Sequence, residues 1–145
     1  MMCNKKLHNL TLQKKEEILS IIRTYLQSYS SILFAFVHGS FLEEQISFRD
    51  IDIAVFIEEE NVRHQSKILD LCLELSAQLS FLIHINVDVH ALNDSGIGFR
   101  YEVTRGELLL TRDEEISFEF IEETRLEYFD LKPLLEENLN DLLKK

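Results

Sequence analysis

The segment from Phe36 to Ile57 constrains the fold more than any other part of the chain. Gly39 and Ser40 interrupt an apolar run, and nine residues separate Ser40 from Asp50-Ile51-Asp52, which leads into a second apolar run. The pattern predicts two β-strands with a tight turn after the first. Alternate side chains of a strand share one face, with a rise of about 3.3 Å per residue, so Asp50 and Asp52 should project side by side. Paired carboxylates suit a hard divalent cation such as Mg²⁺.

The Gly39-Ser40 turn supplies groups that can bind phosphate. Glycine lets the backbone approach a ligand closely, and exposed amides of a turn or helix start favour phosphate oxygens. The Ser40 hydroxyl can donate to the same group. Together with the two aspartates, the turn predicts metal-dependent chemistry on a nucleotide. The alternative is that Asp50 and Asp52 are only the polar face of a half-exposed strand.

The remaining periodicity indicates an α/β (α+β) fold in which a small sheet is flanked by helices. We expect a first helix from about Thr11 to Ser28, capped by Asn9 or Thr11. Leu71, Cys72, Leu75 and Leu79 predict a second helix that ends near Phe81. Strands are expected at about 32–37, 51–57, 83–90 and 107–110. Residues 93–96 are expected to form a turn that a short helix or loop follows, and the segment after the last strand is expected to be helical.

At 145 residues the chain is expected to form a single domain, 1–145, with a core of about 10–112 and a helical segment over 113–145. Within that segment, Asp130 is expected to cap a new helix that has Pro133 in its first turn. Cys3 and Cys72 do not suggest a disulfide framework, and no signal or membrane-spanning run is visible. We therefore expect a cytoplasmic protein without a membrane partner.

The formal charge of −11 is carried mainly by residues 113–145. An acidic surface repels nucleic-acid phosphates, so direct binding of nucleic acid is not expected. The acidic segment has two interpretations. It is either a solvated helix face or a docking surface for a basic partner.

The motif of Gly39-Ser40, a spacer of about ten residues and Asp50-x-Asp52 in an apolar strand resembles the signature of the DNA polymerase β-like nucleotidyltransferase superfamily. Residues 85–93 resemble the strand of that family that carries a third carboxylate, with Asp88 as the match. Residues 101–110 are similar to a following strand, and residues 128–135 to a carboxy-terminal helical segment. The chain length resembles the minimal nucleotidyltransferase (MNT) group, whose members are often antitoxins paired with a HEPN ribonuclease toxin.

The resemblance implies a small mixed sheet with flanking helices and a specific activity. Such antitoxins transfer AMP from ATP to a tyrosine of the cognate HEPN toxin, with which they form a hetero-oligomer. By this resemblance Asp50, Asp52 and Asp88 would be catalytic and hold one or two Mg²⁺ ions, while Gly39 and Ser40 would bind the nucleotide.

The loop departs from the family pattern. Many relatives have an arginine shortly after Gly-Ser and a serine before the first aspartate, whereas this chain has Glu43, Glu44 and Arg49 there. Negative charge near a triphosphate weakens its binding, and Arg49 is expected to offset this by pairing with a phosphate.

Two other functions remain open at this point. The chain could neutralise the toxin by binding alone, which Glu43, Glu44 and the acidic segment favour. It could instead modify a small molecule of the aminoglycoside type, since fold alone does not separate these activities. His38, His84 and His90 lack the spacing of a zinc site and are expected to be hydrogen-bonded structural residues.

Overall fold

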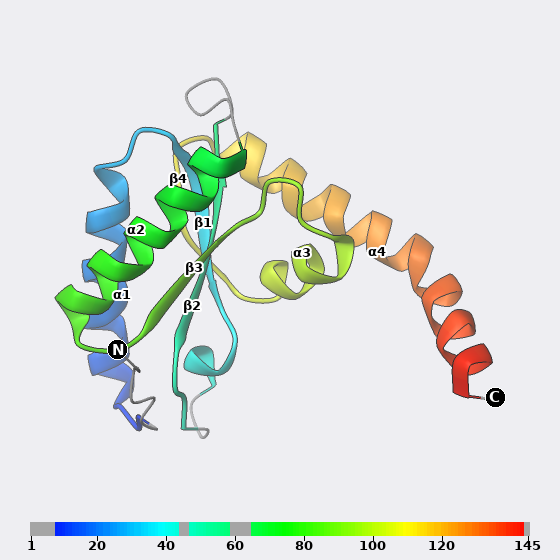
Figure 1. Ribbon diagram of the computed structural model, residues 1–145, viewed down its shortest axis with the longest axis horizontal. Helices are drawn as coiled ribbons and strands as arrows, with labels where there is room; N and C mark the ends of the chain where they lie inside the picture. The colour runs from blue at the N-terminus through cyan, green and yellow to red at the C-terminus, as the bar shows by residue number, and fades with distance from the viewer. Residues whose placement is uncertain (1–7, 44–46, 59–64, 144–145) are drawn as a thin grey trace.

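A mixed four-stranded sheet forms the centre of the molecule (Figure 1). The computed structural model describes residues 8–43, 47–58 and 65–143. The strands are β1 (Ile32–His38), β2 (Ile51–Ile57), β3 (Val87–Ala91) and β4 (Glu107–Thr111), in the spatial order β3-β2-β1-β4. β1 is antiparallel to both β2 and β4, whereas β2 and β3 run parallel. This sheet with flanking helices confirms the expected fold class.

The helices α1 (Leu12–Gln27) and α2 (Gln65–Ile83) lie together on one face of the sheet (Figure 1). The Thr11 hydroxyl caps α1 by accepting a hydrogen bond from the Lys14 amide at 3.2 Å. Of the two predicted caps, Thr11 is therefore the one used. The main core between helices and sheet is largely aliphatic, with Phe41 and Phe48 added, and Cys72 is part of it. Burial raises the pKa of the Cys72 thiol to about 11.

The opposite face is covered by α3 (Ile97–Thr104) and by the first half of α4 (Glu114–Leu143). Here the core is aromatic. The rings of Phe34 and Phe56 stack with centroids 5.1 Å apart, and Phe120 of α4 packs against both. Because side chains alternate along a strand, His38 and Asp52 belong to this same face, at the ends of their strands beyond the aromatic cluster.

The boundary between α2 and β3 differs from the prediction. The expected strand over 83–90 begins only at Val87, because α2 continues through Ile83, which packs on the core. His84, with a φ of 65°, then ends the helix in the left-handed conformation. The Val87 amide donates to the Ser80 hydroxyl at 2.8 Å, which ties the start of β3 to the last turns of α2.

The predicted helix break before Pro133 is wrong, since α4 runs from Glu114 to Leu143 with the proline inside it. A proline cannot donate to the carbonyl four residues earlier, here that of Phe129. Both residues are exposed, so water can take the place of the missing donor. Of the described helices, none is long and apolar enough to cross a membrane.

Candidate nucleotide site

The turn after β1 requires a glycine for two reasons. Gly39 has a φ of +85°, which residues with a side chain rarely adopt. A Cβ at this position would also lie 2.8 Å from Oδ2 of Asp52. The backbone of Gly39 is therefore in close contact with the Asp52 carboxylate, and Ser40 follows as the first residue of the 3-10 helix η1 (Ser40–Leu42).

Two parallel strands bring the three predicted carboxylates together. The register of β2 and β3 pairs Asp52 with Asp88, and Asp50 lies just before β2. Asn86 links Asp50 to Asp88, because its Nδ2 donates to Oδ1 of Asp50 at 2.9 Å and to Oδ1 of Asp88 at 3.4 Å. Residues 36 positions apart in the sequence thus share one end of the sheet.

Asp52 has the most unusual electrostatic environment of the three. Partial burial raises the pKa of its carboxyl group, and the nearby charges of Asp88 and Asp50 raise it further. His38 and His90 act in the opposite direction. A cation at this end of the sheet would relieve the repulsion among the carboxylates.

The donor chemistry of the site fits Mg²⁺, because carboxylate oxygens are the protein ligands this ion prefers. As they stand, no three His, Cys, Asp or Glu side chains among the described residues are grouped closely enough to hold a metal ion. The Asn86 amide nitrogen is bonded to both Asp50 and Asp88. An ion held by these two carboxylates would replace those hydrogen bonds.

His38 differs from the prediction. His38 lies opposite Asp52 in the antiparallel register, and its Nε2 is buried without a hydrogen-bond partner within the described part of the chain. Burial lowers the pKa of the His38 imidazole, so the neutral form is favoured. His84 and His90 are exposed. His38 is thus not the hydrogen-bonded residue that was predicted, whereas the exposure of His84 and His90 does not test that prediction.

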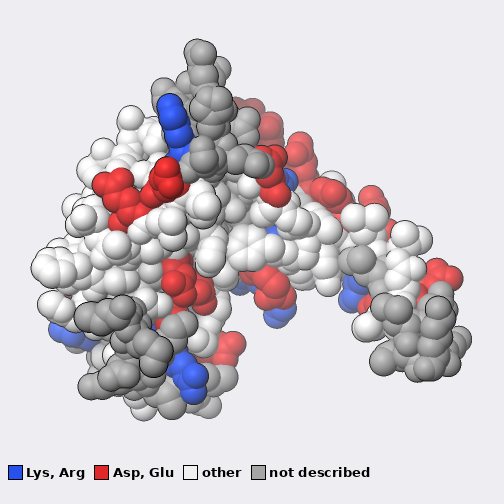
Figure 2. Space-filling view, in the orientation of Figure 1, with Lys and Arg blue, Asp and Glu red and all other residues white. Residues whose placement is uncertain are grey.

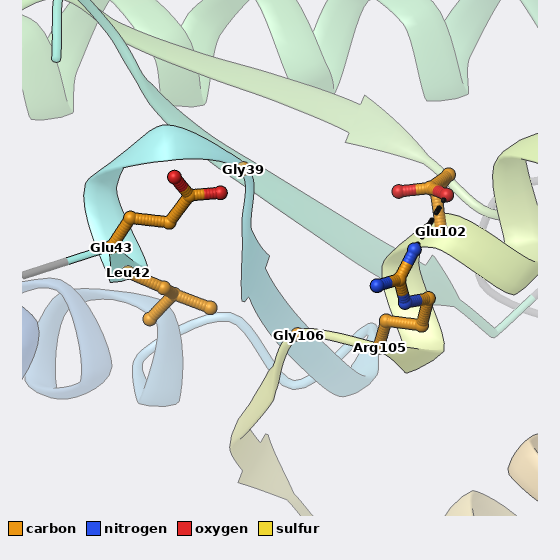
Figure 3. A pocket seen from close by; sticks show the side chains of 6 residues that line it. All are labelled: Gly39, Leu42, Glu43, Glu102, Arg105 and Gly106. Atoms are coloured by element: carbon orange, nitrogen blue, oxygen red, sulfur yellow. Dashed lines mark hydrogen bonds and ion pairs between the residues drawn. The ribbon is translucent and has the colours of Figure 1, made fainter. Parts of the chain in front are cut away.

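A pocket of about 230 Å³ opens beside the Gly-Ser turn (Figure 3). Glu43 lies on one side of the pocket, next to Gly39, and Arg105 and Glu102 lie on the other side. Arg105 and Glu102 form an ion pair at 3.4 Å. Gly106 makes this arrangement possible. A Cβ there would collide with the Val37 carbonyl oxygen, so only glycine lets the end of α3 approach β1 this closely.

Arg105 is a cation of the pocket that sequence reasoning did not select. Arg49, the predicted phosphate partner, is exposed and is absent from the described residues that line this pocket. The signal for Arg105 was the glycine that follows it directly before an apolar strand, which is typical of a close backbone approach.

Lys15 was also missed, and it fixes the backbone next to the pocket. It is 7 % exposed, and its Nζ donates to the carbonyl oxygens of Phe41 at 2.7 Å and of Glu43 at 3.2 Å. The ammonium also lies 5.3 Å from the ring centres of Phe41 and Phe48. The helix α1 thereby holds the end of η1 in place.

Comparison with known proteins agrees with this geometry. The family model described as "Polymerase beta, Nucleotidyltransferase" matches residues 20–115, about two thirds of the chain. No curated protein sequence matches the chain.

Several solved structures share the fold. One, described as a tri-AMPylated Shewanella oneidensis HEPN toxin in complex with MNT antitoxin, superposes with a TM-score of 0.69 at 19% identity, covering 89% of this chain and 98% of that one. A toxin-antitoxin structure with AMP-PNP gives 0.67 at 19% identity, with the same coverage of both chains. The toxin-antitoxin MntA-HepT gives 0.64 at 20% identity, over 90% of this chain and 98% of that one. At such identities the likeness establishes a shared fold, which the matching family model identifies as that of polymerase β-like nucleotidyltransferases.

Proposed function

We propose that this chain, which belongs to the polymerase β nucleotidyltransferase family, transfers AMP from ATP to a tyrosine of a HEPN toxin and thereby acts as its antitoxin. The family supports the transferase chemistry. The solved structures with similar folds, one of them an AMPylated HEPN toxin with its MNT antitoxin, support the acceptor and the partner. A reaction that consumes ATP and silences a ribonuclease belongs in the cytoplasm.

One observation carries the proposal more than any other. The register of β2 and β3 sets Asp52 beside Asp88, and the same Asp52 carboxylate is in close contact with Gly39. A phosphate held at the turn would therefore lie next to the carboxylates. Such adjacency is what a phosphoryl transfer needs, because its catalysis consists mainly of positioning and charge stabilisation.

The residues take the following roles in this proposal. Gly39 and Ser40 bind the triphosphate of ATP through backbone amides and a hydroxyl. Asp50, Asp52 and Asp88 are the residues that would hold magnesium. The ion would neutralise charge on the triphosphate and on the departing pyrophosphate.

The transfer step itself involves one bond made and one broken. The tyrosine oxygen attacks the α-phosphorus of ATP, the bond from that phosphorus to the bridging oxygen breaks, and pyrophosphate leaves. We assign to Asp88 the acceptance of the tyrosine proton, as an alternative to its being a metal ligand only.

Arg105 is proposed as a further ligand of the triphosphate. It lines the pocket that contains Gly39, and its partner Glu102 lies on α3, which Arg105 directly follows. Their ion pair is exposed, and such a pair is weak and easily exchanged for a phosphate. Arg49, exposed before Asp50, is retained as a second candidate.

The test is the intact mass of the cognate HEPN toxin after incubation with this protein, ATP and Mg²⁺. We expect the wild type to add one or more AMP groups, and the Asp52→Asn and Asp88→Asn variants to add none. The control is Asp70→Asn, which changes an exposed carboxylate on α2. Transfer by a folded Asp52→Asn variant would contradict the assignment.

Neutralisation by binding alone is the second candidate. Glu43 and Glu102 both line the pocket and would repel a triphosphate. This function predicts a stable complex that inhibits the toxin without ATP and equally well with Asp52→Asn. The mass experiment separates the two, because a complex without mass gain supports binding alone.

A further inference from the structure

We propose that the exposed apolar side chains of α4 form a docking surface for the toxin, and this inference rests on the proposed function for the identity of the partner. We call this set the α4 surface. From Phe118 onward, it comprises the large side chains that are 36% to 63% exposed: Phe118, Leu126, Phe129, Leu131, Leu134 and Leu139. Large apolar side chains left exposed on one helix are typical of an interaction site.

The first half of α4 is the part that packs on the body. Ser117 and Thr124 are buried, and Phe120 joins the aromatic core. After Tyr128 every side chain that the structure describes is exposed. Figure 1 shows the corresponding part of the helix extending away from the sheet as an arm. An exposed helix that still carries leucines is expected to bury them on another molecule.

Charge selects the kind of partner. Over residues 114–143 the sequence has ten acidic side chains against Arg125 and Lys132. Figure 2 shows acidic atoms bordering the white surface of the arm. Two copies of this chain joined along α4 would bring like charges together, which opposes self-association. A ribonuclease toxin must present a cationic surface to bind RNA phosphates, and such a surface complements α4.

The location of α4 agrees with a role in delivering the acceptor. Arg125 donates through Nη2 to the Thr104 carbonyl at 3.0 Å, and the Tyr128 ring stacks on Tyr101 with centroids 3.8 Å apart. These contacts fix α4 to α3, and the residue after Thr104 is Arg105 of the pocket. A toxin held on α4 would thus lie beside the nucleotide site, which raises the effective concentration of its tyrosine.

The test compares two double variants. Leu126→Glu with Leu134→Glu changes the α4 surface, at side chains 62% and 59% exposed. The matched control is Leu69→Glu with Leu73→Glu on α2, at 59% and 60%. We expect the α4 variant to bind purified toxin about tenfold more weakly or worse, while its affinity for ATP is unchanged. The control should bind like the wild type, and wild-type affinity should fall as salt rises.

Three results would overturn the inference. In the first, the α4 variant binds the toxin as tightly as the wild type. In the second, the α2 control loses as much affinity for the toxin as the α4 variant does. In the third, light scattering shows that the wild type is a dimer and that the α4 variant is not. The proposed function fails separately. If the toxin binds through α4 but gains no AMP, the proposed transfer is wrong and the docking surface stands. If the toxin gains AMP and the α4 variant binds it like the wild type, only the docking surface is wrong.

Discussion

At the scale of single residues, the site contains a carboxylate whose charge opposes folding. Asp52 is partly buried, lies between the charges of Asp50 and Asp88, and has a raised pKa. The folded state therefore holds a proton at Asp52 more tightly than the unfolded chain does. Stability from this group is fully present below the unfolded pKa of about 3.9 and is lost as pH rises through the folded value.

We accordingly expect Asp52→Asn to raise the free energy of unfolding at pH 7 without added metal, and to have a much smaller effect near pH 3. Added Mg²⁺ should stabilise the wild type more than this variant. Urea unfolding over a pH series measures both effects. The exposed control Asp70→Asn should show neither, and a variant that is less stable than wild type at pH 7 would contradict the electrostatic account.

The candidate site was partly predictable from single residues. The Gly39 turn and the spacing of the aspartates together predicted the site, because strand periodicity fixes which side chains share a face. Asn86, His38 and Arg105 reach the site through tertiary contacts with other strands and helices. No local pattern in the sequence marks such contacts for Asn86 and His38, and for Arg105 the only local signal was the glycine that follows it, so their part in the site was not foreseen. The roles of the predicted residues stay predictions.

At the scale of elements, the loop that bears the proposed phosphate-binding groups is held by a helix from elsewhere in the chain. Lys15 of α1 donates to two carbonyl oxygens at the end of η1. Both are charge-assisted hydrogen bonds, and the one to Phe41 is buried. The tether joins α1 directly to the turn that follows Gly39.

Replacing Lys15 with methionine should lower the free energy of unfolding by about 2 kcal/mol, because two carbonyl groups lose a charged donor. It should also weaken ATP binding, and Lys15→Arg should restore part of that binding. Lys14→Met, at a side chain 61% exposed, is the control. Urea unfolding and ATP titration give the two quantities. Full ATP affinity in a destabilised Lys15→Met variant would limit Lys15 to a structural role.

The elements themselves were predicted better than their boundaries. Helical spacing located α1 and α2, and apolar runs located the four strands. The apolar run around Ile83 and Ile85 suits a strand or a helix end equally. Packing of Ile83 on the core favours the helix, which therefore continues through this residue. The rule that a proline interrupts a helix failed at Pro133, because the affected turn is exposed and water can replace the missing hydrogen bond at little cost in free energy.

At the scale of the whole molecule, the chain divides into a packed body and an arm. The described side chains after Tyr128 are exposed, so the body gains little from them. The mixed sheet with helices on both faces was expected from the alternation of strands and helices. The net charge indicated an acidic segment but not that it would continue a helix away from the body.

A chain ending at residue 130 should therefore unfold at nearly the same temperature as the full chain, yet bind the toxin more weakly. A chain ending at residue 112 is the contrasting control. It removes Phe120 from the aromatic core and should be strongly destabilised. Thermal unfolding with toxin binding checks both. A marked loss of stability in the longer truncation would show that the arm supports the body.

The parallel pairing of β2 with β3 also sets when the site can exist during synthesis. Asp50 and Asp52 leave the ribosome well before Asp88, and α2 must cross over before the two strands can pair. Until residues 87–91 have emerged, a nascent chain has the Gly-Ser turn and two aspartates but not the third carboxylate. The complete set of carboxylates is thus a late product of folding, assembled only when the crossover closes.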